Sequence, residues 1–182
     1  MPVDTGPSQA VRRRAREMNL VVDRLPNTIE RDHYTPALLG LLNNLLVWGG
    51  SRVFQQLHGI GTNDWRVVSA LGNHPGSTAA QLCEVLGINK SIVSKSVNLL
   101  FDLGMIGQLD GPRGSRHLYL TVQGAKLHDE CMPIALKRQE ILQESLSADE
   151  VRILDELLVR MISSSDALQA YEHQILSERG PA

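Results

Sequence analysis

Apolar residues recur at helical spacing along most of the chain, and this pattern predicts a mainly α protein. Residues 36–58 are apolar on nearly all sides, which indicates a buried helix rather than one that lies free on a surface. Residues 1–8 lack such a pattern and are expected to be disordered. Further helices are predicted over residues 10–23, 63–73 (capped by Thr62), 79–86, 89–103 and 121–145, and from 148 onward.

The segment that begins at Thr78 has the pattern of a helix-turn-helix. Thr78 and Gln81 have capping-box spacing for a first helix, and Gly87 can adopt the left-handed backbone of a sharp turn. Asn89 can cap a second helix, which Gly104 ends. The outer face of this second helix offers short polar or cationic groups able to reach base edges and phosphates: Asn89, Lys90, Ser91, Ser94, Lys95 and Asn98.

A basic hairpin follows the second helix. Residues 110–115 are dense in turn-forming residues, and apolar residues alternate with polar ones in the return strand at 117–120. Arg113 and Arg116 at its tip could enter a minor groove or bind phosphates. A polar helix face alone is more often simply solvated, but a helix-turn-helix followed by a basic hairpin predicts DNA binding.

These segments, in this order, resemble the MarR family of winged-helix transcriptional regulators. The likeness spans about residues 34–168, and the matching segments are 64–68, 81–100, 104–106 and 120–124. It implies a winged helix-turn-helix with a small β-hairpin wing, a helical dimerisation region, a homodimer on a pseudo-palindromic operator, and often DNA release by a small ligand. The usual Asp-x-Arg of the wing is replaced by Pro112-Arg113-Gly114, so either Arg113 or Arg116 could reach DNA.

The resemblance also implies how the chain is divided. We expect long apolar helices near both ends to bury each other across a dimer twofold axis. The expected parts are an N-terminal extension with a helix (1–30), a dimerisation helix (31–61), a winged helix-turn-helix DNA-binding domain (62–124) and C-terminal dimerisation helices (125–182).

A ligand pocket is expected from the same resemblance, near the first long helix and the one after it. An Arg beside an aromatic wall suits an aromatic carboxylate or an acyl thioester. In the alternative interpretation, both Trp lie in the core and both Arg pair with acids. The candidate residues are Trp48, Arg52, Trp65, Arg66 and Ser69.

Charge weakens the case for DNA binding. The net charge is −2, so a DNA-binding surface must concentrate its cations locally, and residues 89–117 have only a modest excess. With so small an excess of positive charge, the alternative is a winged-helix protein-interaction module that does not bind DNA. The Arg12–Arg16 cluster is typical of a solvated face, with contact to DNA phosphates as the alternative.

Other chemistry finds little support in the sequence. Cys83 and Cys131 form no disulfide framework, and together with the absence of a signal peptide they favour the cytoplasm. The six histidines lack metal-ligand spacing, so no cofactor is expected, and a redox- or metal-sensing regulator is a minor alternative. No nucleophile elbow, Walker loop or dinucleotide motif indicates an enzyme. The apolar run at 38–48 is too short to span a membrane.

Overall fold

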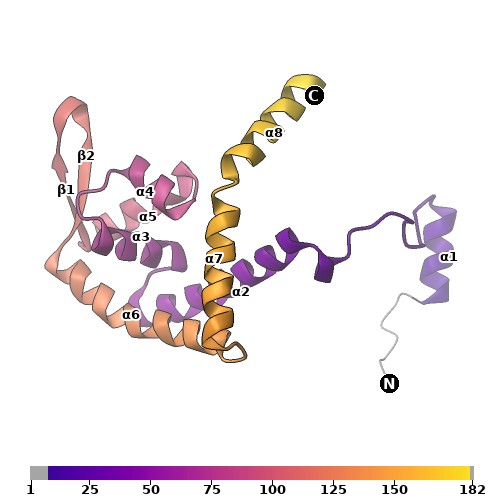
Figure 1. Cartoon of the computed structure of the whole chain (residues 1–182), viewed down its shortest axis with the longest axis horizontal. Helices are drawn as coiled ribbons and strands as arrows, with labels where there is room; N and C mark the ends of the chain where they lie inside the picture. Colours follow the sequence, from indigo (N-terminus) through magenta and orange to yellow (C-terminus); the bar gives the residue numbers. More distant parts are fainter. Residues whose placement is uncertain (1–7, 181–182) are drawn as a thin grey trace. The chain divides into compact units, whose positions relative to one another are not determined.

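The computed structural model describes residues 8–180, so the expectation of disorder for residues 1–7 lies outside the described part. The described chain is mainly helical with one small sheet, which confirms the predicted fold class (Figure 1). The elements are α1 (Gln9–Glu17), η1 (Arg31–His33), α2 (Thr35–His58), α3 (Thr62–Asn73), α4 (Ala79–Leu86), α5 (Lys90–Asp102), β1 (Ile106–Asp110), η2 (Pro112–Gly114), β2 (Arg116–Leu120), α6 (Val122–Gln143), α7 (Ala148–Ile162) and α8 (Ser165–Arg179).

The chain forms two units that divide between Gly49 and Gly50, and the first contains α1, η1 and the start of α2. Helix α1 was predicted to continue to residue 23, and this was wrong because Asn19 adopts a left-handed backbone with φ of +56°. The Leu20 amide then donates to the Ala15 carbonyl (2.9 Å) and the Asn19 amide to the Arg16 carbonyl (3.0 Å). These two bonds form a Schellman cap, which ends the helix.

The core of the second unit lies where α3 packs against α4, α5, α6 and β2. Helix α3 is the central element, because half of its residues are buried. The side chains with almost no exposure come from α3, α4, α5 and α6, from the end of α2 and from the loop after it: Phe54, Ile60, Val67, Val68, Leu71, Leu82, Val93, Leu100 and Cys131.

Helix α3 starts one residue earlier than predicted. Thr62 was expected to be the N-cap, but it is the first helical residue and is buried. The cap is Gly61, whose amide donates to the Asp64 carboxylate (2.7 Å). A Ser51 hydroxyl 3.2 Å from Thr62 Oγ1 supplies the polar contact that Thr62 needs once its side chain is buried.

The helix-turn-helix forms as its sequence predicts. The Thr78 hydroxyl accepts from the Gln81 amide (3.3 Å), and the Gln81 side chain accepts from the Thr78 amide (2.9 Å). Gly87 follows α4 with φ of +60°, a conformation that favours glycine over any residue with a Cβ. Asn89 accepts from the Ile92 amide (3.0 Å) and caps α5.

The wing is the antiparallel pair β1 and β2, in which Ile106 pairs with Leu120 and Asp110 with Arg116. The middle of β2 is bound to the loop that leads into α4. The Gly76 amide donates to the Leu118 carbonyl (2.8 Å), and the Leu118 amide donates to the Ser77 carbonyl (3.1 Å). His117 Nδ1 also hydrogen-bonds to the Gly76 carbonyl (2.8 Å). The wing is therefore fixed to the helix-turn-helix along one side.

The last three helices follow the wing. Thr121 caps α6, which continues through Pro133, and Ser147 with Glu150 forms the predicted capping box of α7. Neither α7 nor the described side chains of α8 include a buried residue. No helix in residues 8–180 is long and apolar enough to cross a bilayer.

Candidate nucleic-acid interface

A groove of about 620 Å³ runs between α5, the start of α4 and the wing. Four of the predicted DNA-binding residues line it: Lys90, Ser94 and Asn98 from α5, and Arg116 from β2. These residues come from segments on either side of the turn at Gly104, so their convergence depends on the tertiary fold. Their helical spacing puts Ser94 and Asn98 one turn apart on the same face of α5.

Charge in the groove differs from that of the whole chain. Two cations, Lys90 and Arg116, line it, and its lining includes no Asp or Glu. The chain as a whole carries a formal charge of −2. A local cationic groove on an acidic body is what the sequence required for DNA binding, because phosphate attraction acts mainly through nearby charges.

The remaining predicted DNA-binding residues lie beside the groove. Asn89 and Ser91 are held to each other, because the Ser91 hydroxyl donates to the Asn89 side-chain oxygen (2.7 Å). Asn89 therefore has a structural role as the cap of α5. Lys95 is exposed on the outer face of α5, and Arg113 is exposed at the wing tip with φ of +60°.

Sequence reasoning missed several residues of the groove. Ala79 and Ala80 are the first two residues of α4, where helical amides lack acceptors within the helix and can bind an anion. Phe101 is 48% exposed and lies one turn beyond Asn98, so helical spacing could have identified it. The others missed are Thr78, Val97, Gln108, Ser115 and Leu118.

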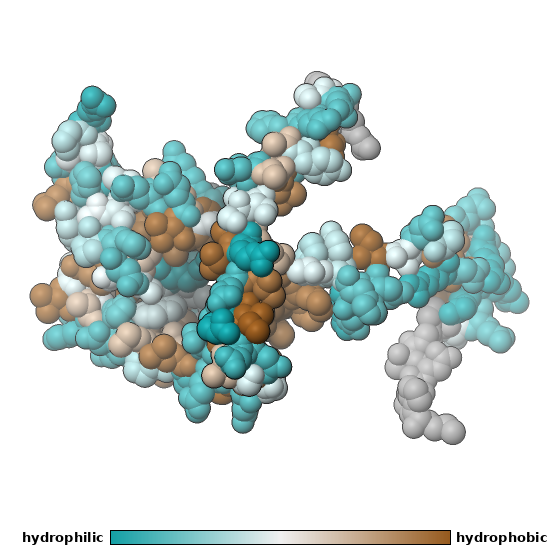
Figure 2. All heavy atoms as spheres, viewed as in Figure 1, coloured by the Kyte–Doolittle hydropathy of each residue, from teal (hydrophilic) through white to brown (hydrophobic). Residues whose placement is uncertain are grey.

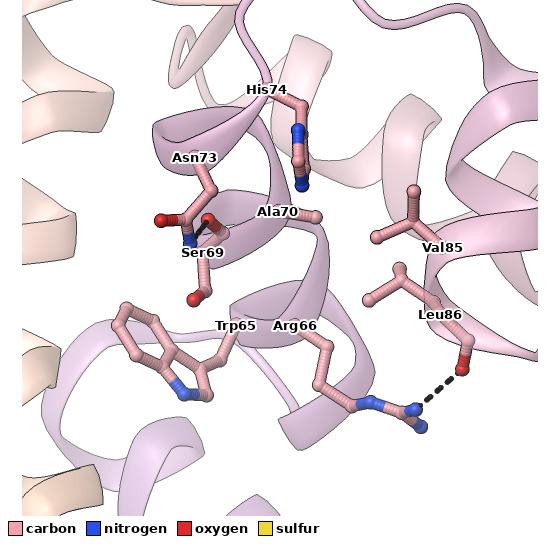
Figure 3. A pocket seen from close by; sticks show the side chains of 8 residues that line it. All are labelled: Trp65, Arg66, Ser69, Ala70, Asn73, His74, Val85 and Leu86. Atoms are coloured by element: carbon pink, nitrogen blue, oxygen red, sulfur yellow. Dashed lines mark hydrogen bonds between the residues drawn. The ribbon is translucent and has the colours of Figure 1, made fainter. Parts of the chain in front are cut away.

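A second hollow of about 410 Å³ lies between α3 and α4, and three predicted ligand-binding residues line it: Trp65, Arg66 and Ser69 (Figure 3). Figure 3 shows the Arg66 guanidinium next to the Leu86 carbonyl, to which it donates (2.7 Å). Trp65 is 9% exposed, and its ring centroid lies 5.5 Å from that of His128, so most of the indole belongs to the core.

The other two predicted ligand residues do not line this hollow. Arg52 is exposed on the last part of α2. Trp48 belongs to the first unit and is 68% exposed. Residues that sequence reasoning did not select complete the lining: Ala70, Asn73, His74, Val85 and Leu86.

The two cysteines lie in different environments. Cys131 is fully buried, and this burial, with a smaller contribution from the charge of Glu130, raises the pKa of its thiol to about 11. Cys83 is only partly buried. Within residues 8–180, no cluster of three or more His, Cys, Asp or Glu residues could hold a metal ion.

We expect a thiol-specific reagent at pH 8 to modify Cys83 and leave Cys131 unmodified until the protein is denatured. Because the Cys131 pKa is raised, only about one thiol in a thousand is ionised at that pH, and the thiolate is the reactive form. Absorbance at the reagent's wavelength before and after denaturant counts the modified thiols, and Cys83→Ser identifies which one reacts. Rapid modification of Cys131 in the folded Cys83→Ser variant would restore the redox-sensing alternative.

Comparison with known proteins agrees with the fold. The model of the MarR family matches residues 58–117. A MarR/EmrR family transcriptional regulator from Acinetobacter sp. ADP1 has a structure that superposes with a TM-score of 0.71 and 26% identity, covering 76% of this chain and 99% of that chain. The chain thus resembles MarR-family transcriptional regulators in both sequence and fold.

Two further relatives extend the MarR-family comparison. The HTH-type transcriptional regulator PetP of Rhodobacter capsulatus is 33% identical over 81 residues, which cover 43% of this chain. The match spans only 48% of PetP, about half of its length. The S. aureus MepR–DNA complex shares the fold, with a TM-score of 0.65 at 20% identity, covering 74% of this chain and 99% of MepR.

The family match also includes almost the whole groove. It begins at the last residue of α2 and ends within β2, so every groove residue except Leu118 lies inside it. The MarR-family likeness and the cationic groove therefore concern the same part of the chain.

Proposed function

We propose that this chain binds double-stranded DNA with the outer face of α5 in the major groove and the wing beside it. This proposal rests on the groove, whose lining contains no carboxylate. The groove combines cations from α5 and β2 with the amides at the start of α4, which have no acceptor within the helix. Ser91, Ser94, Lys95 and Asn98 would contact base edges or nearby phosphates. Arg113 and Arg116 contact the backbone or the flanking minor groove.

The chain acts as a homodimer in this proposal. Helix α7 has no buried residue, and Leu154, Leu157 and Met161 are each at least 40% exposed at helical spacing along one side. Such a contiguous apolar surface is unfavourable in water unless another protein surface covers it. A second copy would cover it through a twofold axis and place two α5 helices about one turn of DNA apart, on a pseudo-palindromic operator.

A small effector would release the DNA. The hollow between α3 and α4 offers the edge of Trp65 and a guanidinium, Arg66, that is already oriented by its bond to Leu86. This chemistry suits an aromatic acid or its thioester. The effector can shift DNA binding only by the difference between its affinities for the bound and released forms, so it relieves repression where the released form binds it better.

A second candidate function follows from the floor of the groove. Val97, Phe101 and Leu118 give it an apolar strip, and an apolar strip with a polar rim also suits a peptide. This is the winged-helix protein-interaction module that the charge balance left open.

One experiment on the full chain separates these functions. We expect light scattering to give twice the 20.1 kDa of one chain. We also expect fluorescence anisotropy to show tighter binding to a duplex from the region upstream of its own gene than to a shuffled duplex, with affinity falling steeply as salt rises. A 20.1 kDa particle would refute the homodimer. Absence of binding to either duplex at low salt would refute DNA binding and favour the interaction module.

A further inference from the structure

Helix α1 is an exposed basic helix whose role the winged helix does not explain. It carries Arg12, Arg13, Arg14 and Arg16 against a single acid, Glu17. The whole chain has a net charge of −2, so the rest of the chain carries −5 against the +3 of this helix. None of its residues is buried. The helix therefore concentrates positive charge in a protein that is otherwise acidic, and Figure 2 shows hydrophilic residues gathered over it.

Two of these cations have no partner among residues 8–180. Arg13 lies 3.7 Å from the Glu17 carboxylate and Arg16 lies 3.5 Å from that of Asp23, both as exposed pairs that contribute little. The side chains of Arg12 and Arg14 make no ion pair or hydrogen bond with any other residue in that range, and only their backbone groups are bonded, to Ser8 and Met18. Arg12, Arg13 and Arg16 also line a common hollow on successive turns of the helix. The side chains are thus positioned to receive an anionic ligand with several charged oxygens.

The composition of α1 favours nucleic acid over lipid. All four cations are arginines, whose planar guanidinium binds phosphate oxygens in a bidentate way. The apolar residues of the helix are only Ala10, Val11 and Ala15. Helices that lie in a membrane surface bury large residues such as Trp, Phe or Leu, and α1 has none of them.

We propose that α1 is a second DNA contact, which binds backbone phosphates outside the groove of the winged helix and reads no sequence. This rests on the proposed function, because it presumes that the winged helix holds a duplex. Seventeen residues, 18–34, separate α1 from α2 and include only the short turn η1. At full extension they reach at most roughly 55 Å, which is enough to place α1 on DNA flanking the operator. A nine-residue helix is marginal alone, so phosphate binding also stabilises it.

The test compares two charge-matched double variants of the full chain. Arg12→Gln with Arg14→Gln removes the two unpartnered cations of α1, and glutamine preserves helix propensity. Arg24→Gln with Arg31→Gln removes the same charge from the same unit, where Arg24 is paired with Glu30 and Arg31 with Asp32. Anisotropy is measured from about 50 to 200 mM salt on the upstream duplex and on a shuffled duplex, the range over which phosphate contacts change affinity strongly. Circular dichroism checks that both variants fold.

We expect the α1 variant to lose about 3.6 from the slope of log affinity against log salt, since the homodimer loses two arginines from each copy and each phosphate contact contributes about 0.9. Its ratio of affinities for the two duplexes should stay that of the parent protein. The control variant should keep the parent slope. A parent-like slope in the α1 variant would overturn the inference and leave the proposed function intact, whereas a parent protein that binds no duplex would refute both.

A vesicle assay tests the alternative that α1 binds a membrane surface. The parent protein and the α1 variant are sedimented with phosphatidylcholine vesicles that contain anionic phosphatidylserine. We expect the two proteins to sediment with the vesicles to the same extent over the salt range used for the DNA slopes. If the parent were retained and the α1 variant were not, with both showing equal DNA slopes, α1 would be a membrane-binding helix and the inference would be wrong.

Discussion

The Gly124→Ala variant is expected to unfold roughly 6–12 °C below the parent protein, because about 3 kcal/mol of overpacking and lost capping falls on a chain of this size. Gly124 is buried in the first turn of α6. A Cβ built on it would lie 2.0 Å from the backbone oxygen of Met105, which cannot move like the end of a flexible side chain.

The strain would reach several bonds at once. The Met105 carbonyl accepts from the Thr121 amide (3.0 Å), and the Thr121 hydroxyl donates to the Gly104 carbonyl (2.7 Å) while accepting from the Gly124 amide (3.0 Å). This joint connects the end of α5, both strands of the wing and the start of α6. Displacing Met105 would therefore weaken the cap of α6 and move the wing relative to α5.

Gly107→Ala is the matched control, since no atom lies within 4 Å of a Cβ at this position in β1. Differential scanning calorimetry on both variants gives the comparison. We expect the Gly107 variant to melt close to the parent protein. Equal melting temperatures for the two variants would show that the contact with Met105 does not limit stability.

Lys95→Ala should weaken binding to the upstream duplex by roughly 10- to 100-fold while the protein stays folded and dimeric. Lys95 lies on the exposed face of α5, four residues from Ser91 and three from Asn98. It has no acidic partner in the described part of the chain, so its removal leaves no carboxylate unpaired. Anisotropy at one fixed salt concentration measures the loss.

Lys126→Ala is the control for Lys95, because it removes the same side chain from another exposed helical position, in α6. Binding by this variant should match that of the parent. If folded Lys95→Ala bound the duplex as tightly as Lys126→Ala, α5 would not be the recognition helix, even where the protein does bind DNA.

The parts of the fold that depend on local chemistry were predictable. Capping boxes, such as Thr78 with Gln81 and Ser147 with Glu150, join groups three residues apart, so the sequence displays them directly. Gly87 was predictable for the same reason, since the turn needs a left-handed backbone.

Other features depend on competition between alternative hydrogen bonds, or on contacts between residues that are far apart in the sequence. The end of α1 at Asn19 was missed because apolar residues continue beyond it, although Asn, after Gly, is the residue that most readily adopts the left-handed backbone of a Schellman cap. The break between α7 and α8 follows a similar competition, in which the Ser163 hydroxyl donates to the Arg160 carbonyl (2.8 Å). The groove could not be predicted, because it forms only where the wing folds back towards α5, and residue spacing does not show this contact.

In the proposed DNA complex, the bonds that hold the wing to Gly76 and Ser77 would also influence which operators the protein binds. Because these hydrogen bonds fix the wing to the helix-turn-helix, the DNA-binding surface can change its shape only a little when it contacts a duplex. The duplex must then deform to fit the protein. Sequences whose base steps bend easily, or whose minor groove narrows easily, do so at lower energetic cost. Preference among operators would extend to positions that no side chain touches.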